Sequence, residues 1–168
     1  MPGACLLRFE EDHRLRQVLQ QVFAALLTKD RARYHELACE AYSDALVWGS
    51  SPCQPPVSQP LVAALYSNRS LCHTKMGRNE QALQDADNSL GASSTFLKAY
   101  VRKVRALQAL GRHEEAVNCA ETLIERASAA SSDSSMQNIA GSVSLSAARN
   151  LRRDISGFVL SQQSQSNS

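Results

Sequence analysis

The 168-residue chain is poor in aromatic residues, at 5%, and poor in charge of one sign, with a formal net charge of +2. Few aromatic residues argue against a sheet protein, because strands favour aromatic and β-branched side chains while the plentiful Leu, Ala and Gln favour helices. The low net charge argues against a strongly basic nucleic-acid-binding protein, which needs excess positive charge to attract phosphate. Hydrophobic residues are 43% of the chain, too many for a fully disordered one. We therefore expect one folded, mainly helical domain.

Long hydrophobic runs and paired cysteines are also missing. No stretch reaches the roughly 18 consecutive apolar residues that a membrane span needs, and the N-terminal residues do not resemble a secretory signal. We expect a protein that is cytoplasmic and binds no membrane. In such a reducing compartment, cysteines without paired spacing are expected to be buried thiols rather than disulfides. The five are Cys5, Cys39, Cys53, Cys72 and Cys119.

A repeat of 34 residues runs through the centre of the chain. Tyr66 and Tyr100 are 34 residues apart, as are Gly77 and Gly111. Each glycine is followed by a similar sequence, RNEQAL in one copy and RHEEAV in the other. Alanines recur at the same offset, namely Ala82 and Ala86, then Ala116 and Ala120. A period of 34 is typical of the tetratricopeptide repeat, a helix–turn–helix unit.

Each copy of the repeat predicts two helices. We expect first helices at residues 62–76 and 97–110, each ended by a glycine that can adopt the left-handed conformation. Second helices are expected at residues 79–90 and 113–127. Their alanines, four residues apart, place small side chains on one face, so the two helices of a repeat can approach closely. The expected fold is all-α, with tetratricopeptide repeats forming a short right-handed superhelix.

A degraded copy is expected upstream, which gives repeats at residues 12–47, 61–96 and 97–127. Apolar residues four apart predict the first helix of this copy at residues 12–28. Tyr42 and Tyr66 are 24 residues apart, where a regular array needs about 14. We interpret the excess as a proline-rich insertion at residues 48–60, which contains Pro52, Pro55, Pro56 and Pro60.

The composition changes near residue 128. Residues 128–142 are rich in serine and predict a flexible linker, and residues 162–168 are expected to be disordered. Between them, residues 143–161 predict an amphipathic helix. This helix either caps the apolar face of the last repeat or binds a partner, with Leu151, Ile155 and Phe158 as anchors.

Motifs of catalysis and of metal binding are lacking. The chain has no glycine-rich phosphate loop, no G-x-S-x-G and no H-E-x-x-H. Cys72 with His73, and His113 with Cys119, do not have the i, i+4 spacing that brings two ligands to one helix face. We expect neither an enzyme nor a bound metal or cofactor.

Two segments carry a sharper resemblance. The sequences YSNRS at residues 66–70 and KAYVRK at residues 98–103 resemble the co-chaperone class of tetratricopeptide domains. The resemblance implies a clamp for two carboxylates, which holds the C-terminal Glu-Glu-Val-Asp tail of cytosolic heat-shock chaperones. By this resemblance, Asn68, Lys98 and Arg102 occupy three of the five clamp positions.

The chemistry of these residues supports anion binding independently of the family resemblance. If the first helices line a concave surface, Asn68 and Lys75 face it from one repeat, and Lys98, Arg102 and Arg105 from the next. Lys98 and Arg102 are i, i+4 neighbours, so both reach the same point. A terminal carboxylate and an Asp side chain would meet a bidentate Arg, a point-charge Lys and a neutral amide donor.

The first repeat departs from the family pattern. The clamp has Lys-x-x-Gly-Asn there, whereas this chain offers Arg16 and Gln20, which keep a charge and an amide, or, in another alignment, Gln20 and Ala24. The expected function is non-catalytic binding of an acidic C-terminal peptide, as a co-chaperone-like adaptor. The alternative is a generic scaffold for an unrelated protein partner, which would use the same surface or the helix at 143–161.

Overall fold

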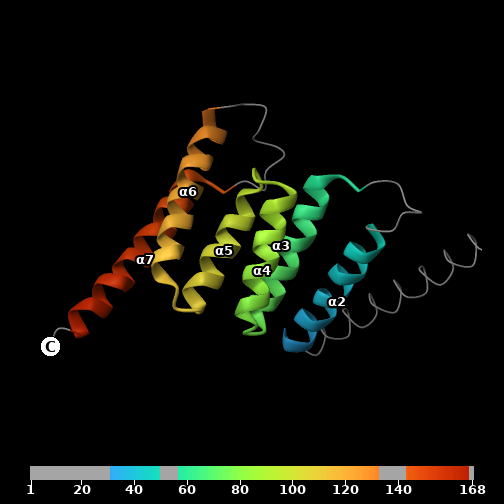
Figure 1. Ribbon diagram of the computed structural model, residues 1–168, viewed down its shortest axis with the longest axis horizontal. Coiled ribbons are helices and arrows are strands. Elements are labelled where there is room, and N and C mark those ends of the chain that lie inside the picture. Colours follow the sequence, from blue (N-terminus) through green and yellow to red (C-terminus); the bar gives the residue numbers. More distant parts are fainter. Residues whose placement is uncertain (1–30, 50–56, 133–142, 167–168) are drawn as a thin grey trace, which may run out of the picture.

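The computed structural model describes residues 31–49, 57–132 and 143–166 (Figure 1). Every regular element in these three ranges is an α-helix, which confirms the all-α prediction for them. The helix expected at residues 12–28 and most of the expected insertion and linker lie outside the described residues. The helices are α2 (Arg31–Gly49), α3 (Gln59–Lys75), α4 (Asn79–Ala92), α5 (Leu97–Ala109), α6 (His113–Ser132) and α7 (Leu145–Ser166).

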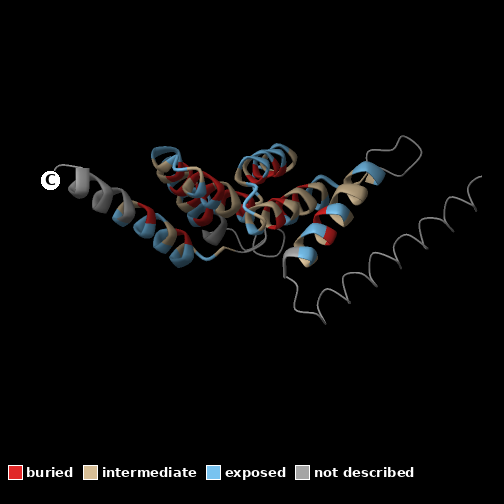
Figure 2. Cartoon of the chain, turned by 90° about the horizontal axis from the view of Figure 1, so that it is seen from below, coloured by how far each residue is buried: buried red, intermediate tan, exposed pale blue. Residues whose placement is uncertain are grey.

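Neighbouring helices in the chain are neighbours in space. Each helix packs against the next, from α2 to α7, and α3 also contacts α5. Figure 1 shows this order, with the first helices α3 and α5 and the second helices α4 and α6 of the two central repeats. Buried residues gather where neighbouring helices face each other, and exposed residues on their outer sides (Figure 2). The array therefore buries a continuous core between stacked helices.

Two glycines end the first helices in the same way. Gly77 and Gly111 both have φ of +74°, the left-handed region that costs glycine nothing. The N–H of Gly77 donates to the carbonyl of Thr74 at 3.1 Å, and the N–H of Arg78 to that of His73 at 2.9 Å. The same two bonds, at 3.1 and 2.9 Å, surround Gly111. This Schellman arrangement satisfies the last carbonyls of each helix, and confirms the role predicted for both glycines.

Small side chains let the helices of each repeat approach closely. The four repeated alanines, Ala82, Ala86, Ala116 and Ala120, are all fully buried, as predicted. Two serines tie α3 to α4: Ser70 Oγ donates to the carbonyl of Ala82 and Ser89 Oγ to that of Ala63, both at 2.7 Å. Because each hydroxyl finds a backbone acceptor, the hydrogen bond offsets the cost of removing it from water.

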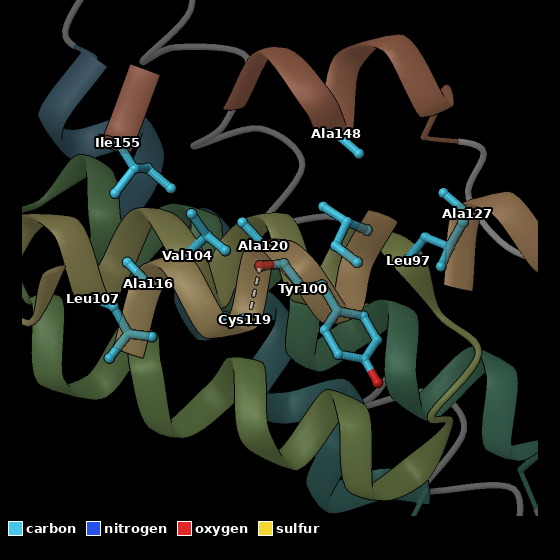
Figure 3. Packing of buried hydrophobic residues seen from close by; sticks show 11 residues of the cluster. Leu97, Tyr100, Val104, Leu107, Ala116, Cys119, Ala120, Ala127, Ala148 and Ile155 are labelled. Carbon is cyan, nitrogen blue, oxygen red and sulfur yellow. Dashed lines mark hydrogen bonds between the residues drawn. The ribbon is translucent and has the colours of Figure 1, made fainter. Parts of the chain in front are cut away.

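The second central repeat has the larger core. Val104, Leu107 and Leu123 are almost completely buried beside the alanines of α6 (Figure 3). Cys119 lies in the same cluster, and its thiol donates to the carbonyl of Tyr100 at 3.9 Å. Burying an aliphatic side chain of this size contributes about 1.5–3 kcal/mol, so this repeat anchors the array.

The last helix covers the outer side of α6. Ala148 and Ile155 of α7 are fully buried in the core cluster, and Leu151 is partly buried against it. An apolar stripe spaced at i, i+3 and i+7 thus faces the repeats, while Arg149 and Arg153 face solvent. In this arrangement α7 caps the last repeat.

Three helix ends differ from the expected ones by three residues or more. α6 continues to Ser132 and α7 to Ser166, so residues 128–132 and 162–166 are helical rather than linker and disordered tail. Neither segment contains Gly or Pro, so nothing in the backbone stops the helix. α3 begins at Gln59 with Pro60 in its first turn, where the missing N–H of proline costs nothing.

Candidate functional site

The candidate residues of α3 and α5 form two stripes with similar spacing. Asn68 and Lys75 lie on α3, and Lys98, Arg102 and Arg105 on α5. Steps of three, four and seven residues keep each stripe on one side of its helix. Arg102 is half-buried and the other four side chains are exposed. We call these five residues the α3–α5 surface.

The two stripes lie next to each other. α3 and α5 are in direct contact, and Cys72 lies on α3 between Asn68 and Lys75. Burial raises the pKa of the Cys72 thiol to about 11, and the positive charge of Arg102 opposes this rise. The guanidinium of Arg102 on α5 thus lies near enough to α3 to affect the pKa of the Cys72 thiol. The structure brings these described candidates to one side of the array, while Arg16 and Gln20 lie outside the described residues.

Arg102 is the most unusual member of the surface. Its Nε atom is buried and has no hydrogen-bond partner within the described part of the chain. Burial lowers the pKa of Arg102, and the neighbouring Arg105 lowers it further. A guanidinium that is removed from water without an anion beside it is unfavourable. Sequence reasoning found this position but not its burial, which depends on how α5 packs against α3.

Most other cations of the two central repeats are paired with carboxylates, and Arg126 instead donates to the carbonyl of Ser94 and lies over the ring of Tyr100. Four of them meet carboxylates, at 2.6 to 3.8 Å, in the pairs Arg69–Asp85, Arg78–Glu36, Lys103–Asp87 and Arg112–Glu115. By contrast, the four cations of the α3–α5 surface form no ion pair with any described residue. The α3–α5 surface thus carries positive charge that no described carboxylate pairs.

A polar network holds α3 in place beneath this surface. Arg69 donates from Nε and Nη2 to the two oxygens of the buried Asp85 on α4, at 2.8 and 2.7 Å. Its Nη1 donates to Ser43 Oγ on α2 at 3.0 Å. One guanidinium therefore joins three helices and fixes the turn that carries the adjacent Asn68. This pair was not predicted from the sequence; the signal for it was an aspartate between the buried alanines of α4.

Similarity to known proteins agrees with this architecture. Residues 97–129 match the family model of the tetratricopeptide repeat. The TPR2B domain of yeast Sti1, solved in a complex with pHsp70, superimposes with a TM-score of 0.53 at 18% sequence identity, over 84% of this chain and 95% of that one. The chain has a tetratricopeptide repeat fold.

Two curated relatives are similar to part of the chain. The human zinc finger CCCH domain-containing protein 7B is 35% identical over 107 residues, which are 62% of this chain and 11% of that protein. The DnaJ homolog subfamily C member 7 homolog of Schizosaccharomyces pombe is 38% identical over 88 residues, which are 52% of this chain and 17% of that protein. The chain thus spans less than a fifth of either relative.

Cys39 on α2, His73 on α3 and Asp85 on α4 lie close together, but they do not form a nucleophilic triad. His73 Nε2 lies 3.5 Å from Cys39 Sγ and 3.7 Å from Asp85 Oδ2. A triad needs the two different ring nitrogens for the nucleophile and the acid, whereas here one nitrogen faces both. Burial also raises the pKa of the Cys39 thiol, which keeps it protonated and unreactive.

The described residues hold no group of three or more side chains arranged to bind a metal ion. Cys39, Cys72 and Cys119 are free and buried, as predicted for small core residues. Within the same ranges, none of the helices combines the length and the apolar character needed to cross a membrane.

A hollow of about 470 Å³ lies elsewhere, on α4 and the turn between α5 and α6. It contains Leu83 and Leu110, with polar residues around them, and shares no residue with the α3–α5 surface. Two of its charged residues, Asp87 and Arg112, are already paired with Lys103 and Glu115. It therefore offers little charge to a ligand.

Proposed function

We propose that this chain is a non-catalytic adaptor whose α3–α5 surface binds the acidic C-terminal peptide of a partner protein, in the manner of a co-chaperone. The observation that carries the proposal is the half-buried guanidinium of Arg102, whose Nε has no partner in the described residues. Lys98, one turn away, adds a second cation without a carboxylate. The fold shared with a domain solved in a complex with pHsp70 supports heat-shock chaperone tails as the ligand.

The surface suits the two carboxylates of a C-terminal aspartate. Arg102 can form a bidentate pair with one carboxylate, and Lys98 adds a point charge from the same helix face. Asn68 contributes a neutral amide donor, which positions a carboxylate without adding charge. A peptide that covers Arg102 also completes its unsatisfied hydrogen bond. Hydrogen bonds to charged groups contribute about 1.5–3 kcal/mol each, enough for these contacts to dominate the affinity.

The first repeat would supply the other half of the clamp. We propose Arg16 and Gln20 for this role, because they keep a charge and an amide where the family has Lys and Asn. Tails of this kind belong to cytosolic chaperones, so the proposal places the protein in the cytoplasm.

The test compares two peptides that end in Glu-Glu-Val-Asp, one with a free C-terminus and one with a C-terminal amide, by titration calorimetry. The free peptide is expected to bind with micromolar affinity, about −8 kcal/mol. Amidation removes one of the two carboxylates and should weaken binding at least tenfold. Equal binding of both peptides would favour the scaffold for an unrelated partner instead.

A further inference from the structure

An exposed apolar patch lies at one end of the α2–α3 pair. Val47 and Trp48 are in the last turn of α2, and Leu61 is in the first turn of α3. These large hydrophobic side chains remain 73%, 43% and 52% exposed among the described residues. A Cβ added to Gly49 would lie 3.0 Å from Val57 Cγ2, so the end of α2 and the chain that enters α3 lie close together (Figure 1). We call Val47, Trp48 and Leu61 the apolar end patch.

The N-terminal segment of the chain has a composition that suits this patch. Residues 4–9 have the sequence ACLLRF, in which every residue except Arg8 is hydrophobic. Gathered apolar side chains on a protein surface mark a contact site. Packing the segment against the apolar end patch would remove both from water, which is favourable.

The short chain that precedes α2 places this segment near the patch. Only Lys29 and Asp30 separate α2 from the helix expected at residues 12–28, and so short a connection joins antiparallel neighbours. At about 1.5 Å per residue, the expected helix is about 26 Å long and the 19 residues of α2 span about 29 Å. The start of the expected helix therefore falls at the level of the end of α2, where Val47 and Trp48 lie.

The segment is also long enough to cross the patch. Packed helices lie about 8–10 Å apart, so the expected helix is one such step from α2 and, since α2 packs against α3, about two steps from α3. An extended chain advances about 3.3 Å per residue, which puts Phe9 about 10 Å and Leu6 about 20 Å from the start of the expected helix. Phe9 thus reaches the end of α2, and Leu6 reaches Leu61 on α3.

We propose that residues 4–9 form an N-terminal strap, which crosses the end of the α2–α3 pair and covers the apolar end patch. The contact lies within the chain and uses no residue of the α3–α5 surface, so it is independent of the proposed function. The strap ties the helix expected at residues 12–28 to α2 and α3 at the end opposite their connection through Lys29 and Asp30. It thus closes the first repeat, as α7 covers the last one, because the two ends of a repeat array both need a cover.

Trp48 is the only tryptophan of the chain, so its fluorescence reports on the patch directly. The experiment compares the full chain with its triple variant Leu6→Ser, Leu7→Ser, Phe9→Ser. In the wild-type protein the indole should resist quenching by acrylamide. In the triple variant its emission should move to longer wavelength and its quenching should increase. Arg8→Ser, the matched control in the same segment, should leave both unchanged. Equal emission and quenching in the wild-type protein and the triple variant would overturn the strap.

A second measurement keeps the test valid if the triple variant does not fold. Phe9→Trp in a Trp48→Phe background moves the single tryptophan to the strap. Its indole should be shielded from acrylamide, and adding Val47→Ser and Leu61→Ser should expose it. Quenching as strong as that of free N-acetyltryptophanamide would contradict the proposal, and so would shielding that survives the two serine substitutions. Shielding that increases with protein concentration would also contradict it, because a second copy of the chain would then cover the patch.

Discussion

Arg69 and Asp85 form a two-point ion pair that joins α3 to α4, with N–O distances of 2.8 and 2.7 Å. The Asp85 side chain is 5% exposed and the Arg69 side chain 21%. Because the arginine also bonds to Ser43 on α2, the pair stands at the junction of three helices. Its bonds to α2 and α4 hold α3, the helix that carries Asn68.

We expect Asp85→Ala to lower the free energy of unfolding by about 2–4 kcal/mol, because it leaves a guanidinium largely buried without its anion. The matched control is Asp87→Ala, which removes an aspartate that is 49% exposed and paired with Lys103, and should cost less than about 1 kcal/mol. Urea denaturation of both variants measures the difference. Similar losses for the two would contradict the structural role of the buried pair.

Gly77→Ala and Gly111→Ala should each cost about 1–2 kcal/mol, because both positions have φ of +74° and a Cβ is disfavoured there. No atom lies within 4 Å of an added Cβ at either site, so the cost is backbone strain and not a clash. Gly91→Ala, inside α4 with no positive φ, should instead stabilise the protein by about 0.5–1 kcal/mol. Thermal unfolding of the three variants distinguishes these opposite signs.

His73 should make stability depend on pH. Burial lowers the pKa of His73; Asp85 opposes this, and Arg69 and Arg78 add to it. Since the folded pKa lies below the unfolded value of about 6.5, the unfolded chain binds the extra proton first. Stability is therefore complete above about pH 7 and is lost as the pH falls through 6.5 towards the folded pKa.

The measurement for His73 is the free energy of unfolding at pH 7.5 and at pH 5.5, for the wild-type protein and for His73→Gln. The variant should lose less stability between these pH values, because it lacks the imidazole whose lowered pKa makes protonation unfavourable in the folded protein. An identical loss in the two proteins would show that His73 titrates normally.

Arg102→Met should stabilise the ligand-free protein by about 0.5–1 kcal/mol, because it replaces a half-buried charge that lacks an anion with an apolar side chain of similar length. Chemical denaturation without peptide measures this gain. A loss of stability would mean that Arg102 already has a partner in the folded chain, and the unsatisfied charge that supports ligand binding would disappear.

The repeats could be predicted from the sequence because they depend on local features. Gly77 and Gly111 end helices because glycine adopts the left-handed conformation, and the buried alanines allow close helix contacts because they are small. Both features can be recognised in a single sequence, because they recur at a fixed spacing. The ends of α6 and α7 could not be predicted in this way, since no Gly or Pro stops α6 near residue 128 or α7 near residue 162.

The candidate site was only partly predictable. The positions of Lys98 and Arg102 follow from i, i+4 spacing, but the burial of Arg102 depends on the contact between α5 and α3, which spacing alone does not reveal. The Arg69–Asp85 pair was missed for the same reason, because it joins residues on two helices. By its spacing from Ala82 and Ala86, Asp85 falls at a buried position of α4. A charged side chain is stable there because Arg69 pairs with it.

The most direct test of the account is the affinity of Arg102→Met for a peptide that ends in a free Glu-Glu-Val-Asp. The wild-type protein should bind it in the micromolar range, and Arg102→Met should bind it about ten- to a hundredfold more weakly, since it loses hydrogen bonds to a carboxylate worth about 1.5–3 kcal/mol. Arg112→Met, in the turn between α5 and α6, should bind the peptide like the wild-type protein. If Arg102→Met binds as tightly as the wild-type protein, the α3–α5 surface does not hold the carboxylates and the proposed function is wrong.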